Sequence, residues 1–187
     1  MIKINHSSLA CIGINILLGL LLNSTAAWAY NYEPRNYYHA TAKKEIMQIE
    51  HYHLNQGIEK FKQGKYEYAW SEFASILHYF PNHPKALQQL SDLSIQIEEP
   101  QRAVKYFERA ISYFPNEAPT YEILGSFFYR LKNYNQAITQ YKKGLALDQS
   151  NEECRYKLGL AKELAQFNNY TQQPTTHTNQ LQLLPTP

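Results

Sequence analysis

Residues 118–151 read APTYEILGSFFYRLKNYNQAITQYKKGLALDQSN, and this stretch decides the fold because its pattern recurs upstream at a fixed spacing. Small residues hold some positions of the pattern and large apolar residues hold others. The small ones are Gly57, Ser91, Gly125 and Gly159, with Ala69, Ala103 and Ala137, and the large ones include Phe73, Phe107 and Tyr141. A fixed period of about 34 residues is typical of a solenoid of stacked units and not of one closed globule.

Each unit is expected to hold two helices. In the segment 103–111, apolar residues at 103, 107, 110 and 111 mark one helix face, and the earlier segment 87–94 of the same unit shows a second stripe at 87, 90, 91 and 94. Gly64 lies where a left-handed helix cap costs least, and Pro100 suits the first turn of a helix. Ser150 to Glu153 reads as a capping box before a final helix.

The unit resembles the tetratricopeptide repeat, a helix-turn-helix of about 34 residues. In 118–151 the resemblance is carried by Tyr121, Leu124, Gly125, Phe128, Tyr134, Ala137 and Tyr141. In 84–117 it is carried by Leu87, Leu90, Ser91, Ala103, Phe107, Ala110 and Pro115, and in 50–83 by Gly57, Gly64, Tyr66, Ala69, Phe73 and Pro81. The resemblance implies an all-α solenoid of three repeats, 50–83, 84–117 and 118–151, closed by a capping helix at 152–167.

The N-terminal segment 1–29 predicts an export signal. Lys3 is its only Lys, Arg, Asp or Glu, Leu9 to Leu22 is apolar, and Ala27-Trp28-Ala29 supplies a cleavage site before Tyr30. The apolar run is short for a membrane span, so no span is expected after cleavage, although an uncleaved anchor remains the alternative. We therefore expect a periplasmic or extracellular protein.

The remaining chain, 30–187, carries 17 basic and 16 acidic residues, which makes nucleic acid a poor candidate partner. Cys154 is its only cysteine, so no internal disulfide is expected, and a buried spectator thiol is the favoured reading. Segment 30–49 is predicted to be partly helical. Segment 168–187 is rich in Thr, Gln and Pro and is expected to be a disordered tail.

No catalytic motif stands out, so we expect neither an enzyme nor a cofactor. The possible metal ligands are histidines without the spacing of converging ligands, so no metal is expected: His39, His51, His53, His78 and His83.

The resemblance also implies where a partner would bind, because the first helices of such repeats line a concave groove. In this register the groove residues are Leu54, Asn55, Ile58, Phe61, Gln88, Gln89, Asp92, Glu122, Ser126, Tyr129 and Arg130. One branch of the family clamps the C-terminal carboxylate of cytosolic chaperones with Lys, Asn and Arg. Leu54 and Ile58 stand where that branch has Lys and Asn, which argues against the same clamp here.

These features predict an exported, non-catalytic adaptor that holds a protein or peptide partner in envelope assembly, secretion or trafficking. Two alternatives stay open. The chain could be an accessory subunit of an envelope enzyme complex, or a structural module that self-associates. A further alternative concerns Leu54 and Ile58, which segment 38–49 could cover by folding over the first repeat.

Overall fold

The computed structural model describes residues 33–39 and 43–171. The chain divides into two compact units, Met1–Glu33 and Pro34–Pro187, and the architecture below is that of the second. The predicted export signal lies outside the described residues, as does the tail from residue 172 onward.

The described part of the second unit is built from helices joined by short turns, and no strand occurs within these ranges. Their bounds are α2 (Lys43–Ile49), the π-helical turn η2 (Glu50–Leu54), α3 (Asn55–Lys62), α4 (Tyr66–Tyr79), α5 (Pro84–Gln96), α6 (Pro100–Tyr113), α7 (Ala118–Arg130), α8 (Tyr134–Leu147) and α9 (Glu152–Thr171).

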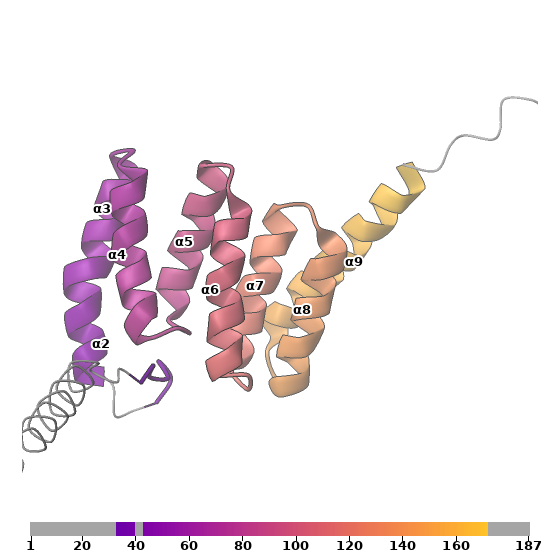
Figure 1. Cartoon of the computed structure of the whole chain (residues 1–187). Coiled ribbons are helices and arrows are strands. Elements are labelled where there is room, and N and C mark those ends of the chain that lie inside the picture. Colours follow the sequence, from indigo (N-terminus) through magenta and orange to yellow (C-terminus); the bar gives the residue numbers. More distant parts are fainter. Residues whose placement is uncertain (1–32, 40–42, 172–187) are drawn as a thin grey trace, which may run out of the picture. The chain divides into compact units, whose positions relative to one another are not determined.

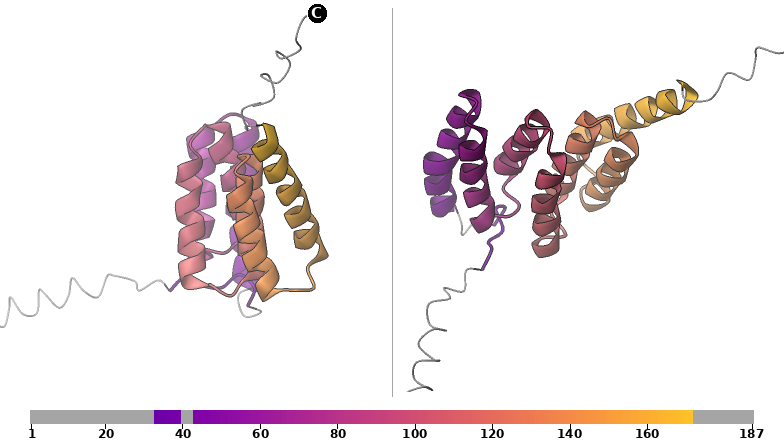
Figure 2. Two further views of the ribbon diagram at one scale, coloured as in Figure 1. Left: turned by 90° about the vertical axis from the view of Figure 1, so that its right-hand side faces the viewer. Right: turned by 45° about the horizontal axis from the view of Figure 1, so that its top comes forward.

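The helices pair and stack in chain order, as Figures 1 and 2 show. Helix α3 packs on α4, α5 on α6 and α7 on α8, while α4–α5 and α5–α7 contacts join successive pairs and α9 closes the stack on α8. Fully buried aromatic rings such as those of Phe73, Phe107 and Tyr141 fill the layers between helices. This is the predicted all-α solenoid of three helix pairs and a closing helix.

Local signals in the sequence explain where the helices begin and end. Gly64 has φ of +73°, which a residue with a side chain rarely adopts. Pro84 and Pro100 open α5 and α6, where a missing N–H costs nothing. The predicted cap of α9 needs a correction, because the Oδ1 of Asn151, and not Ser150, accepts the N–H of Cys154 at 2.8 Å.

The segment before the first repeat continues directly into it, because α2 and η2 run straight into α3. Ile49, at the end of α2, and Ile58 both pack against the core cluster that includes Leu54, so the end of segment 38–49 contributes to the burial of Leu54. The π-helical turn closes with the N–H of Asn55 on the carbonyl of Glu50. At the other end, α9 continues to Thr171, beyond the predicted end at 167.

Residues 34–39 form a strap that lies along the turns between repeats. The N–H of Arg35 donates to the carbonyl of Tyr79 at 3.0 Å, and the N–H of Tyr37 donates to Oδ1 of Asn82 at 2.9 Å. Nδ2 of Asn82 donates to Oδ1 of Asn36 at 2.7 Å, and Nδ2 of Asn36 donates to Glu117 at 2.6 Å. The strap thus ties the first turn between repeats to the second.

Within the described ranges, no helix has both the length and the apolar character that crossing a membrane requires.

Candidate binding groove

A groove of about 330 Å³ opens between the first helices of the second and third repeats and the closing helix. It is lined by Pro84, Gln88, Ser91, Asp92, Glu122, Ile123, Ser126, Phe127, Arg130, Glu153 and Lys157. These residues come from α5, α7 and α9, which the repeat stacking brings side by side.

The wall of the groove is fixed by the packing of α7 on α8. A Cβ atom on Gly125 would lie 2.6 Å from the Tyr141 ring, so only glycine allows this close approach without a shift. The hydroxyl of Tyr141 then reaches Ser126 and donates to its Oγ at 3.2 Å. Burial raises the pKa of Tyr141, so the phenol stays protonated and keeps this bond.

An apolar pocket of about 210 Å³ adjoins the groove. Its lining is Ser126, Tyr129, Arg130, Tyr141, Lys157 and Leu160. Ser126, Arg130 and Lys157 line both spaces, so they form a shared wall. A bound segment could therefore place an apolar side chain in the pocket while its backbone and polar groups lie in the groove.

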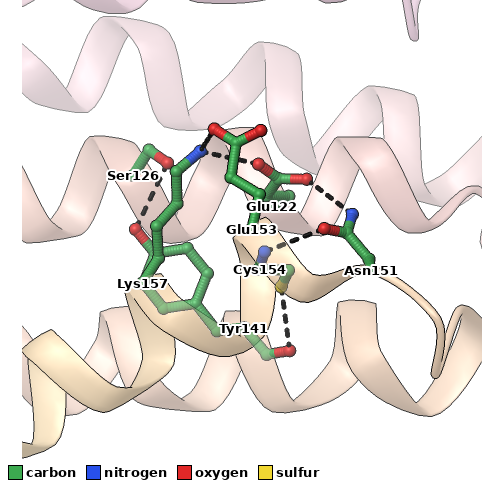
Figure 3. A network of polar contacts seen from close by, with 7 residues as sticks. All are labelled: Glu122, Ser126, Tyr141, Asn151, Glu153, Cys154 and Lys157. Atoms are coloured by element: carbon green, nitrogen blue, oxygen red, sulfur yellow. Dashed lines mark hydrogen bonds and ion pairs between the residues drawn. The ribbon is translucent and has the colours of Figure 1, made fainter.

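Lys157 lies at the centre of a charge network between α7 and α9 (Figure 3). Its Nζ is 2.6 Å from Oε1 of Glu122 and 2.9 Å from Oε1 of Glu153. Nδ2 of Asn151 donates to the other oxygen of Glu122 at 3.0 Å. Burial alone would lower the pKa of Lys157, but its bonds to the two carboxylates outweigh burial and raise it.

The second cation of the groove is also paired. Arg130 on α7 contacts Oδ1 of Asp92 on α5, so the ion pair joins two repeats. Both basic side chains of the groove thus hold carboxylates of the chain itself. A negatively charged ligand would compete with those carboxylates for Arg130 and Lys157.

The backbone N–H of Cys154 joins the network through Oδ1 of Asn151, whereas the thiol of Cys154 contacts neither Lys157 nor its carboxylates. Its Sγ is 3.6 Å from the carbonyl of Tyr141, and its side chain is buried as predicted. Burial raises the pKa of the thiol to about 11, so the reactive thiolate is scarce at neutral pH.

The structure gathers only part of the predicted groove set. Gln88, Asp92, Glu122, Ser126 and Arg130 line the groove, and Tyr129 lines the apolar pocket. Gln89 is half-buried on α5 and lines neither space.

The groove residues that were predicted on the first repeat do not line this groove. Leu54 is only 4% exposed and belongs to the core, so it cannot be the exposed anchor that the repeat register predicted. Ile58 and Phe61 are partly buried against the same core. Leu54 and Asn55 edge a separate cavity of about 600 Å³ near Lys85.

Two charged groove residues were missing from the predicted set, Glu153 and Lys157. The repeat register could have found Lys157, because it holds the position in α9 that Ile123 holds in α7, and Ile123 also lines the groove. Among the described residues, no group of three or more His, Cys, Asp or Glu side chains is placed to hold a metal ion.

Comparisons with known proteins agree with this architecture. A family model described as TPR repeat matches residues 125–164, and one described as Tetratricopeptide repeat matches residues 84–117. The first TPR domain of human RPAP3 superposes with a TM-score of 0.50 at 17% identity, over 67% of this chain and 96% of that one. The Sgt2 TPR domain from Aspergillus fumigatus gives 0.51 at 17% identity, over 70% and 85%.

Two curated proteins are similar in sequence over 119 residues. Hsp70-Hsp90 organizing protein 2 of Arabidopsis thaliana is 29% identical, and Hsp70-Hsp90 organizing protein 1 of Glycine max is 27% identical. The matched region is 60% of this chain and 21% of each relative, so the chain spans about a fifth of their length. Family models of the tetratricopeptide repeat thus match parts of the second and third helix pairs, and the chain has the fold of a solenoid of stacked helix pairs closed by α9.

Proposed function

We propose that this chain is a non-catalytic adaptor that binds a segment of a partner protein in the groove between α5, α7 and α9. The observation that carries the proposal is the apolar pocket beside the polar groove, with Ser126, Arg130 and Lys157 as their shared wall. A concave site with a small apolar pocket and a few convergent polar groups is the usual form of a binding site.

The geometry favours a segment with one apolar anchor. The pocket of about 210 Å³ accepts a side chain such as leucine or phenylalanine. Gln88 and Ser126 offer hydrogen bonds to a bound backbone. Because Arg130 and Lys157 are already paired, an acidic segment gains less here than it would beside unpaired cations.

A chaperone tail is the second candidate partner, since two relatives are Hsp70-Hsp90 organizing proteins. Its carboxylates would compete with Glu122 and Asp92 for Lys157 and Arg130. One variant distinguishes the two candidates. Glu122→Gln weakens the ion pair with Lys157, so it should strengthen the binding of an acidic segment and leave the binding of an uncharged segment unchanged.

The test is capture of partners from source cells by the full chain and two matched variants. Leu160→Glu puts a charge at the apolar pocket, and Leu147→Glu makes the same change at an exposed site on α8. We expect Leu160→Glu to lose the partner and Leu147→Glu to retain it. A well-folded Leu160→Glu protein that still retained the partner would exclude the groove.

We further propose that the adaptor is exported and acts in the cell envelope or outside the cell. The support is the sequence of residues 1–29, with cleavage before Tyr30. N-terminal sequencing of protein from the source cell tests this, with Tyr30 as the expected first residue. Recovery of the intact Met1 form from membranes would favour the uncleaved anchor instead.

A further inference from the structure

In two of the three repeats, an aromatic ring of the second helix lies on a glycine of the first helix. A Cβ atom on Gly57 would lie 2.5 Å from the ring of Phe73, and one on Gly125 would lie 2.6 Å from the ring of Tyr141. The ring follows its glycine at the same sequence distance in both repeats. The glycine thus leaves room for an aromatic ring, and we call such a glycine position a seat. Where a ring packs against the glycine, the contact forms part of the core of the repeat.

Helix α9 carries the same seat without a ring in it. Gly159 holds the position in α9 that Gly125 holds in α7, yet a Cβ atom there would have no neighbour within 4 Å. Helix α9 is therefore the first helix of a fourth unit, and its side that would receive a second helix is open. Figure 1 shows α9 extending away from α8 toward Thr171.

The chain that follows α9 does not offer the missing ring. The position equivalent to Phe73 and Tyr141 is Thr175, with Pro174 directly before it, and residues 171–187 contain no Phe, Trp or Tyr. Moreover, α9 stays helical at 168–171, where the other repeats have already turned back into their second helix. Residues 172–187 therefore supply no aromatic side chain for this position.

Helix α9 itself exposes rings on the open side. Tyr156, Phe167 and Tyr170 are 67%, 62% and 79% exposed, and none of their rings contacts another aromatic ring of the described residues. With Gly159 and Glu163 they follow spacings of three or four positions, which places all five on one helix face. We call this set the open face of α9. It lies opposite Cys154, Leu158 and Ala161, which pack in the core.

We propose that the open face of α9 is a dimerisation surface, on which two copies of this chain pair antiparallel and each inserts Phe167 onto Gly159 of the other. The register is self-complementary. When Glu163 of one copy faces Glu163 of its partner, Phe167 faces Gly159 and Tyr170 faces Tyr156. A two-fold axis requires this kind of reciprocal match.

One helix face is smaller than the about 1,200–2,000 Å² that stable interfaces bury, so the dimer should be weak and concentration-dependent. The two Glu163 side chains meet at the axis, and like charges there oppose pairing. Removing that charge should therefore strengthen the dimer, which is a result that simple loss of structure cannot mimic.

The experiment is sedimentation equilibrium of the full chain over a concentration series that reaches the high-micromolar range. We expect Phe167→Ala to weaken the dimer about tenfold or more, because a ring in a fitted seat dominates such an interface. Tyr68→Ala, an exposed ring on α4, is the matched control and should change nothing. Gly159→Leu should abolish the dimer, and Glu163→Gln should tighten it about twofold.

Cross-linking tests the register. A short bis-maleimide should join two copies of Glu163→Cys and should leave Lys162→Cys, the neighbouring exposed position, unlinked. Cys154 is buried and does not compete. A chain that is monomeric at every concentration, or a dimer indifferent to Phe167→Ala, would overturn the proposal.

The same measurements exclude the other occupants of this face. If a dimer formed only after deletion of residues 172–187, the chain's own downstream segment would be the occupant and the proposal would fail. The proposal stands apart from partner binding in the groove, because Phe167→Ala should leave the captured partner in place, while Tyr129→Ala, which alters the apolar pocket from α7, should leave the dimer in place.

Discussion

The ring of Tyr141 on α8 lies against the backbone of Gly125 on α7, so that a Cβ atom there would fall 2.6 Å from two ring carbons. This contact holds the third helix pair together and sets the position of Ser126 on the groove wall. The equivalent glycine on α9, Gly159, has no ring against it, so the same substitution can be compared at the two glycines.

The first prediction compares the same substitution at these two glycines. Gly125→Leu should lower the free energy of unfolding by about 1–3 kcal/mol or more, because the new side chain overpacks the Tyr141 ring. Gly159→Leu meets open space and gains helix propensity, so it should be neutral or slightly stabilising at concentrations where the chain is monomeric. Urea unfolding measures both, and equal losses would show that the two seats do not differ.

The second prediction concerns the strap. Asn82 is fully buried and bonds both Tyr37 and Asn36, so Asn82→Ala should cost about 1–3 kcal/mol through the unpaired groups it leaves. Asn116 ends the sequence Tyr-Phe-Pro-Asn at 113–116, as Asn82 ends the same sequence at 79–82, and Asn116 is exposed. Asn116→Ala should therefore shift the thermal midpoint little, and a shift as large as that of Asn82→Ala would contradict the role of the strap.

The third prediction concerns acid. His83 is fully buried, its Nδ1 accepts the N–H of Ala86, and its Nε2 is 3.2 Å from Glu50. Although Glu50 would favour the charged ring, burial lowers the pKa of His83 to about 4. Between pH 6.5 and about 4, the unfolded chain then binds a proton that the folded chain does not, so stability falls as pH falls.

The size of this acid effect should be about 1–3 kcal/mol. His83→Asn keeps a cap for α5 but cannot titrate, so its unfolding free energy should depend less on pH over this window. Identical pH slopes in the two proteins would show that His83 does not titrate in the unfolding reaction.

The fourth prediction concerns α9. It covers Ala137 and Tyr141, which form one core cluster with Cys154, Leu158 and Ala161. Ending the chain after Thr171 should leave the thermal midpoint almost unchanged, whereas ending it after Asn151 should lower it by several degrees or cause aggregation. If the two truncations melted alike, α9 would not be a stabilising cap.

The repeat period predicted most of the helices because each unit carries its own small and large apolar residues at fixed positions. Gly125 and Tyr141 could be matched from spacing alone, and Gly64 and Pro100 marked helix boundaries correctly. What the period could not predict is contact outside the repeat. The strap pairs Asn36 with Asn82 and Glu117, and no local pattern in 34–39 indicates those distant partners.

The groove was predictable in position but not in electrostatics. The register placed Asp92, Glu122 and Arg130 correctly, but it treated each as available to a ligand. Their pairing depends on side chains reaching across helices, as Arg130 reaches Asp92 and Lys157 reaches Glu122. Leu54 was misassigned for a similar reason, because the register gives its face of the helix but not the depth at which the neighbouring helices enclose it.

Because Glu122 and Asp92 occupy the cations that a ligand would use, they act as internal competitors. Their effect would be to set a threshold, so that weakly acidic segments are rejected and only a ligand with stronger or more numerous charges enters. Loss of one carboxylate, as in Glu122→Gln, would lower that threshold without disturbing the helix pairs. The scaffold could thus acquire a new class of partner through one substitution, while its repeats stay unchanged.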